Sequence, residues 1–128
     1  MRNGSALASL FLVLSVSRGF SDDTVKKVGG APPADAPVKE VEIHAKKYEF
    51  TPATIDVEAG TLVKIHLTAT DREHGFEIKG FKDSCVKAKP GAPATIEFYA
   101  EKPGEHEFAC CKFCGLGHGK MKGKLVVR

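Results

Sequence analysis

The amino-acid sequence predicts an all-β sandwich over residues 40–128, and three observations support this. Apolar and polar residues alternate over short stretches such as residues 63–67, and a period of two is typical of half-buried strands. Pairs of turn-forming residues, Pro90-Gly91 and Pro103-Gly104, separate these stretches. No run in this part of the chain has the apolar spacing of an amphipathic helix. Short strands joined by such turns favour two packed sheets.

The expected strands follow one another closely along the domain. Residues 41–45 alternate first, and residues 55–57 and 63–67 follow, with a turn at residues 58–60 between them. The remaining expected strands are residues 76–78, 96–98, 106–110 and 122–128. The length of the chain, 128 residues, is enough for one domain of this kind and additional segments.

The first residues of the chain differ in character from the rest. Arg2 precedes an apolar run at residues 6–16, and small residues follow it, which is the pattern of a secretory signal peptide over residues 1–19. An uncleaved N-terminal anchor is the alternative, but the run is short for a stable membrane span. Residues 20–39 are polar and rich in Gly, Pro and Ala, which predicts a flexible linker. We expect a periplasmic or secreted protein.

The charge of the chain argues against a nucleic-acid partner. The formal net charge is +3, and no cluster of Lys and Arg is interleaved with aromatic residues. The hydrophobic fraction of 42% is ordinary for a globular domain.

The stretch "CCKFCGLGHGKM" near the C-terminus concentrates metal-binding side chains. Its candidate ligands are Cys110, Cys114, His118 and Met121. Soft thiolate and thioether groups beside imidazole select copper, and thioether is rare at zinc. A second imidazole, from His74 in "TDREHGFEI", completes the set at the start of an expected strand. The sequence therefore predicts a copper site built from two distant segments.

These motifs resemble the cupredoxins, and specifically the CuA-type domains of cytochrome c oxidase subunit II and nitrous oxide reductase. The resemblance extends over about residues 48–128 and includes "YEFTPATIDVEAG", the D-x-x-H pattern ending at His74, and the C-x3-C-x3-H-x2-M pattern. It implies a cupredoxin-like Greek-key β-sandwich.

The resemblance also implies a role for each candidate residue. Cys110 and Cys114 would bridge two copper ions, and His74 and His118 would each bind one of them. Met121 would be a weak axial ligand, and the backbone carbonyl of Lys112 would be the other. Such a site carries a single electron, so the chain would be an electron-transfer protein and not an enzyme. Two alternatives remain open: a mononuclear type 1 copper protein that leaves Cys110 idle, and a periplasmic copper carrier or chaperone.

The chain departs from the oxidase pattern in ways that bear on its partner. Lys112 stands where oxidase subunit II typically has Glu, and the chain has no Trp. These departures suggest a free-standing domain. The expected docking surface surrounds His118 and carries Lys112, Lys120, Lys122 and Lys124. We expect a redox partner protein with an acidic patch, such as a c-type cytochrome or a terminal reductase.

Two further cysteines are not needed by copper. Cys85 and Cys111 could form a disulfide, which an exported protein permits. Ordinary thiols at these positions are the alternative.

Overall fold

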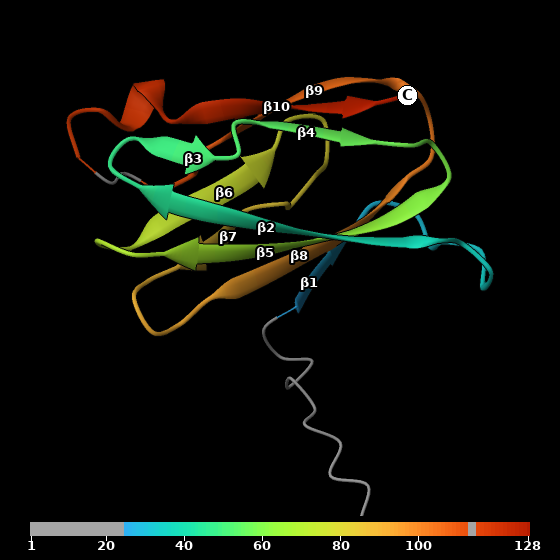
Figure 1. The fold of residues 1–128 in the computed structure, drawn as a ribbon, viewed down its shortest axis with the longest axis horizontal. Helices are drawn as coiled ribbons and strands as arrows, with labels where there is room; N and C mark the ends of the chain where they lie inside the picture. Colours follow the sequence, from blue (N-terminus) through green and yellow to red (C-terminus); the bar gives the residue numbers. More distant parts are fainter. Residues whose placement is uncertain (1–24, 113–114) are drawn as a thin grey trace, which may run out of the picture.

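The computed structural model describes residues 25–112 and 115–128 as a sandwich of two five-stranded sheets. Figure 1 shows the two layers, with the long strands β2 and β5 in one and the paired strands β9 and β10 in the other. The predicted all-β sandwich is therefore confirmed. The candidate ligand Cys114 and its neighbour Phe113 lie outside the described residues.

The first sheet has the order β1-β8-β5-β2-β3 and mixes parallel and antiparallel pairs. Its strands are β1 (Val25–Val28), β2 (Val38–Lys46), β3 (Glu49–Thr51), β5 (Thr61–Ala69) and β8 (Ala94–Ala100). Strand β5 alternates buried and half-buried residues along its whole length. Because β5 lies between β8 and β2, its inward side chains form the centre of the core.

The second sheet has the order β4-β10-β9-β6-β7. Its strands are β4 (Thr54–Val57), β6 (His74–Ile78), β7 (Val86–Ala88), β9 (Gly104–Ala109) and β10 (Lys122–Val127). A short 3₁₀ helix, η2 (His118–Lys120), precedes β10. The second sheet carries both segments from which the sequence predicted metal ligands.

Three phenylalanines pack between the two sheets and behind the candidate site. The rings of Phe50, Phe76 and Phe108 are each fully or almost fully buried. Their centroids lie 5.0 to 5.6 Å apart, within the range of favourable aromatic contacts. This cluster joins β3, β6 and β9 and fixes which faces of β6 and β9 turn inward.

Strand β1 lies within residues 20–39, for which we expected a flexible linker. It pairs in parallel with β8, with Val25 opposite Thr95 and Val28 opposite Phe98. Four residues with the pattern VKKV do not alternate, so the sequence alone carried no strand signal there. Residues 25–28 of the expected linker are thus part of the first sheet.

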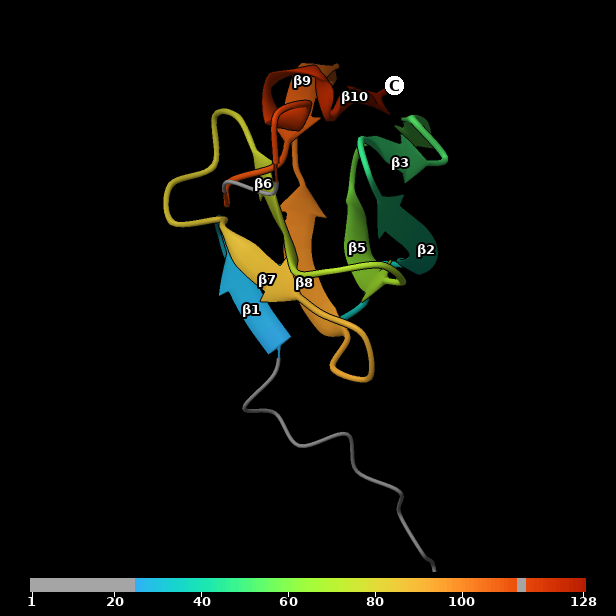
Figure 2. The ribbon, with the colours of Figure 1, turned by 90° about the vertical axis from the view of Figure 1, so that its left-hand side faces the viewer.

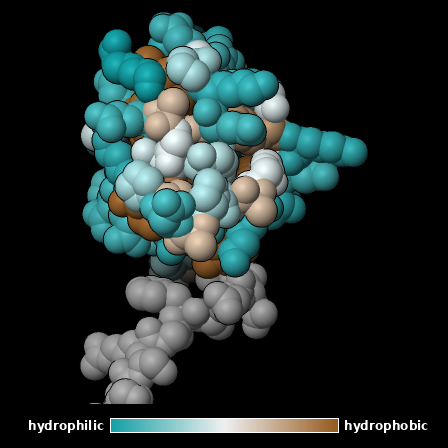
Figure 3. All heavy atoms as spheres, turned by 90° about the vertical axis from the view of Figure 1, so that its right-hand side faces the viewer, coloured by the Kyte–Doolittle hydropathy of each residue, from teal (hydrophilic) through white to brown (hydrophobic). Residues whose placement is uncertain are grey.

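The end of the sandwich opposite the candidate site is mostly hydrophilic. Figure 3 shows this end, with polar residues around small apolar areas. No helix among the described residues is long and apolar enough to cross a membrane.

Gly123 in β10 faces the interior where no side chain fits. A Cβ atom there would lie 2.3 Å from Phe108 Cζ and 2.4 Å from the Ala53 carbonyl oxygen. We expect Gly123→Ala to lower the free energy of unfolding by about 1–3 kcal/mol, because the buried ring or backbone must shift.

The measurement is urea unfolding of the copper-free protein. Gly30→Ala is the matched control, because nothing lies within 4 Å of its added Cβ atom. Equal stability of the two variants would contradict this account of Gly123.

Candidate metal centre

Strand register brings three predicted ligands to one end of the second sheet. Glu77 of β6 and Lys122 of β10 both pair with Ala109, the last residue of β9. Strand β6 therefore begins, β9 ends and β10 begins at the same end, which faces the viewer in Figure 2. The candidate ligands stand beside these strand ends: His74, Cys110 and Met121.

His74 is a completely buried imidazole with one bound and one unbound nitrogen. Its Nε2 lies 2.7 Å from Oδ1 of Asp71, whose carboxylate accepts the hydrogen bond. Since the carboxylate can only accept, Nε2 carries the proton and Nδ1 exposes its lone pair. That Nδ1 has no hydrogen-bond partner among the described residues. A buried acceptor in this state is suited to a metal ion.

Asp71 is held as a carboxylate by the groups around it. Burial works to raise its pKa, but hydrogen bonds from the Lys47 amide, His74 and the Arg72 amide together lower the pKa to about 2. The carboxylate therefore stays charged and fixes both the tautomer and the direction of the His74 ring.

Cys110 lies between the two segments that supply the other ligands. It follows β9 directly, is 6% exposed, and its amide donates to the Met121 carbonyl oxygen at 3.0 Å. Its Sγ donates to the carbonyl oxygen of Lys112 at 2.9 Å. The structure therefore brings the predicted axial carbonyl of Lys112 directly to the Cys110 sulfur.

Met121 and His118 complete the described part of the predicted set. Met121 is almost fully buried, whereas His118 is half-buried at the start of η2. The Met121 amide donates to the His118 carbonyl oxygen at 3.2 Å, so a single short turn connects the two. Among the described residues, no group of three His, Cys, Asp or Glu side chains is gathered closely enough to hold a metal ion.

Cys85 and Cys111 form a disulfide, with a Cα–Cα distance of 6.0 Å. The predicted bridge is therefore confirmed. It leaves Cys110 as a reduced cysteine in the described part of the chain. Gly75 lies against the same bridge, since a Cβ atom there would be 2.6 Å from Cys111 Sγ.

Tyr48 supports the second half of the ligand loop. A Cβ atom on Gly115 would lie 2.5 Å from the Tyr48 hydroxyl oxygen, and one on Gly117 would lie 2.2 Å from its ring. The two glycines therefore let the loop backbone lie directly on the aromatic ring. Gly115 also has a φ of +132°, which favours glycine.

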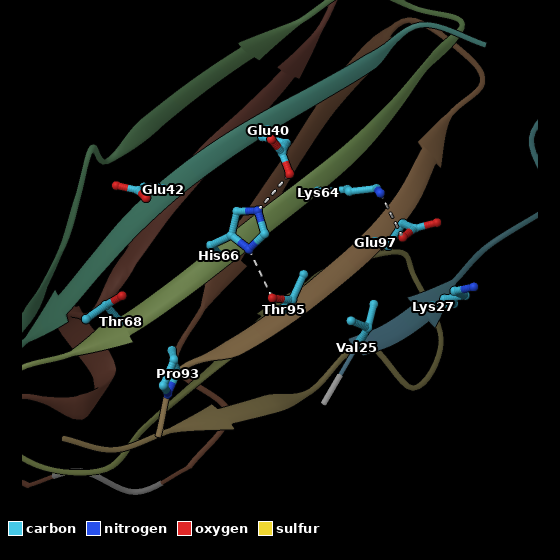
Figure 4. A pocket seen from close by; sticks show the side chains of 10 residues that line it. All are labelled: Val25, Lys27, Glu40, Glu42, Lys64, His66, Thr68, Pro93, Thr95 and Glu97. Atoms are coloured by element: carbon cyan, nitrogen blue, oxygen red, sulfur yellow. Dashed lines mark hydrogen bonds and ion pairs between the residues drawn. The ribbon is translucent and has the colours of Figure 1, made fainter. Parts of the chain in front are cut away.

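The residues present fit a soft metal ion. A buried thiol, a buried thioether and an imidazole with an unused lone pair are the donors that copper prefers. His66 provides a contrast, because both of its ring nitrogens are engaged, by Thr95 Oγ1 at 3.0 Å and Glu40 Oε1 at 3.3 Å. Figure 4 shows this histidine in a polar hollow on the outer face of the first sheet.

Sequence reasoning missed the contacts that support the ligands. It did not pair Lys112 with Glu73, although an ion pair joins their side chains, and the Lys112 ammonium lowers the pKa of Glu73. It also gave Tyr48 and Gly75 no role. The only signals were the position of Glu73 and Gly75 on either side of His74 and the glycines of the loop.

The chain matches the cupredoxin-like domain family over residues 6–127. It is 33% identical over 112 residues to cytochrome c oxidase subunit 2 of Thermus thermophilus, and the alignment covers 82% of each chain.

Solved structures of oxidase subunits are also similar to this chain. A chain of a haem-copper terminal oxidase dimer has a TM-score of 0.67 and 33% identity, with 73% of this chain and 66% of that chain covered. The periplasmic domain of subunit II of the Bradyrhizobium japonicum cytochrome oxidase has a TM-score of 0.64 and 20% identity, with 76% and 86% covered. The chain therefore belongs to the cupredoxin-like family and is homologous to the CuA domain of cytochrome c oxidase subunit II.

Proposed function

We propose that this chain is a copper-binding electron-transfer protein with a binuclear, CuA-like site. The observation that carries the proposal is the buried, unpartnered Nδ1 of His74 at the end of the sheet where Cys110 and Met121 also lie. The residues that would hold two copper ions are His74, Cys110, Cys114, His118 and Met121, with the carbonyl oxygen of Lys112. Bound copper would supply one-electron redox chemistry.

The protein's contribution is to hold these donors in place and to exclude water. His74 and Met121 are at most 1% exposed, and a backbone hydrogen bond joins Cys110 to Met121. Asp71 fixes the orientation of the His74 ring. Donors held in this way need little rearrangement when the charge of the site changes, which favours rapid electron transfer over catalysis.

Two other functions would use the same residues. A mononuclear copper site needs only His74, Cys114, His118 and Met121. A copper carrier needs an exposed ligand set that exchanges its metal readily. The burial of His74, Cys110 and Met121 favours a retained metal over an exchangeable one.

We also propose that the chain is exported to the periplasm or secreted. The signal-peptide pattern of residues 1–19 supports this. The Cys85–Cys111 disulfide supports it independently, because disulfides persist in oxidising compartments.

The proposed docking surface is the loop tip around His118. Leu116 is fully exposed there, and Lys120 and Lys122 are exposed beside it. Neither of these lysines belongs to an ion pair recorded among the described residues, whereas Lys112 and Lys124 pair with Glu73 and Glu105. We propose that an acidic redox partner, such as a c-type cytochrome or a terminal reductase, docks at this tip.

Copper loading tests the nuclearity of the site. We expect two copper ions per chain and an electron paramagnetic resonance spectrum of one electron shared by two nuclei. Cys110→Ser should abolish that spectrum, because Cys110 would serve both ions. His66→Gln is the matched control and should change nothing, since both His66 nitrogens are already engaged.

A ratio of one copper per chain, with a four-line spectrum that survives Cys110→Ser, would show a mononuclear site instead.

Asp71 should determine how tightly His74 binds copper. Asp71→Ala removes the acceptor for Nε2, so the ring loses its fixed tautomer and direction. We expect copper affinity to fall by about 10–100-fold in competition with a chelator. Asp56→Ala is the control, since Asp56 pairs with Arg128 away from the site. Equal affinities in the two variants would remove Asp71 from this role.

Charge at the loop tip should steer the acidic partner. We expect the double variant Lys120→Glu, Lys122→Glu to slow electron transfer by about 10-fold or more at low ionic strength, and salt to reduce the difference. The control is Lys82→Glu, Lys102→Glu, which changes the net charge equally beside the ends of β6 and β8 away from the site. Electron-transfer rates are measured by stopped flow. If they change neither with salt nor in the Lys120→Glu, Lys122→Glu variant, docking is apolar and centred on Leu116.

A further inference from the structure

Residues 110–112 form the first half of the ligand loop. They contact the sandwich through their backbone, as the strand register predicts, and also through two side chains. The β6–β9 pairing of Glu77 with Ala109, continued toward the site, places Gly75 opposite Cys111. The Gly75 backbone does lie against this segment, because its Cβ would be 2.7 Å from the Lys112 nitrogen. Two side-chain attachments are added to this backbone contact.

The first attachment is the disulfide between Cys111 and Cys85. Cys85 immediately precedes β7, and β7 pairs with β6 so that Ala88 lies opposite His74. The bridge therefore ties the loop to the strand on the other side of His74. It joins residues separated by 26 positions, so no local turn could replace it.

The second attachment is the ion pair between Lys112 and Glu73. Glu73 immediately precedes His74. With its ammonium held at the partly exposed surface, Lys112 keeps its carbonyl oxygen 2.9 Å from Cys110 Sγ. The side chain of Lys112 thus contacts one ligand-bearing segment while its backbone contacts the ligand Cys110.

We propose that Cys111 and Lys112 are positioning residues for the copper site. The Cys85–Cys111 disulfide and the Glu73–Lys112 ion pair form a clamp that holds Cys110 and the Lys112 carbonyl oxygen in their ligand positions before copper binds. This inference rests on the proposed function. It assigns a role to the Cys85–Cys111 disulfide and to the Lys112 side chain, neither of which is a proposed copper ligand.

The physical effect of the clamp is preorganisation. A loop that must be ordered by its metal loses conformational freedom on binding, and this loss weakens affinity. A loop already fixed to β6 and β7 avoids that loss. Copper should therefore leave the clamped loop more slowly than an unclamped one.

The disulfide is tested with the double variant Cys85→Ser, Cys111→Ser. Cys85 is exposed and Cys111 half-buried, so both positions accept a hydroxyl group. We expect copper to dissociate into excess chelator at least about 10-fold faster than from the wild type. In the copper-free variant, the Cys110 amide, which donates to Met121, should exchange its hydrogen faster.

The ion pair is tested with Lys112→Met, which keeps the backbone carbonyl. The matched control is Lys124→Met, which breaks the exposed ion pair to Glu105 on β10. We expect faster copper dissociation and a changed reduction potential in Lys112→Met alone. This variant also decides the proposal if the double serine variant fails to fold, as judged by circular dichroism.

If the disulfide is purely structural, the double serine variant unfolds at a lower urea concentration, but its copper dissociation and its Cys110 amide exchange stay as in the wild type. That result overturns the proposal. Lys112→Met releasing copper no faster than Lys124→Met overturns it equally. A wild type that binds no copper refutes the proposed function instead. The amide exchange of the copper-free proteins still decides the clamp in that case.

Discussion

The site depends on the antiparallel register that joins β6, β9 and β10. Because side chains alternate along a strand, the burial of Phe76 also turns His74 inward, and the burial of Phe108 turns Cys110 inward. The aromatic cluster therefore selects the face on which these candidate ligands lie, as well as stabilising the core. A slip of one residue between β6 and β9 would turn one of these two candidate ligands to solvent while the other stays inside. Gly123 belongs to the same constraint, because Phe108 occupies the space of its missing side chain.

The burial of His74 lowers the stability of the folded domain. A buried acceptor without a partner destabilises a protein by about 1–3 kcal/mol, and Nδ1 of His74 is such an acceptor. Asp71 uses the other ring nitrogen and cannot relieve this. This unfavourable contribution arises at the end of the sheet where three candidate ligands lie. His66, with both nitrogens bonded, carries no such penalty. Local instability confined to one histidine is therefore more consistent with a binding site than with the needs of the fold.

Alternation in the sequence predicted the strands that bury one face, and β5 and β8 lie where it placed them. It missed β1, β3 and β7, which are four, three and three residues long, because pairing with a neighbouring strand and not their own pattern makes them strands. Candidate ligands could be named from spacing and donor type, and their binding of copper stays a prediction. The ion pair of Glu73 with Lys112 could not be foreseen, because it depends on the β6–β9 register, which no local pattern encodes.

The two halves of the ligand loop are held by different means. Residues 110–112 are fixed by covalent and ionic contacts to β6 and β7, whereas residues 115–117 lie on the ring of Tyr48 through glycines without side chains. The first half can thus be loosened by removing a side chain, and the second only by enlarging a glycine or removing the tyrosine. This division places the covalent restraint beside the buried donors and the exposed Leu116 beyond them. An exposed tip is thereby separated from the buried candidate donors.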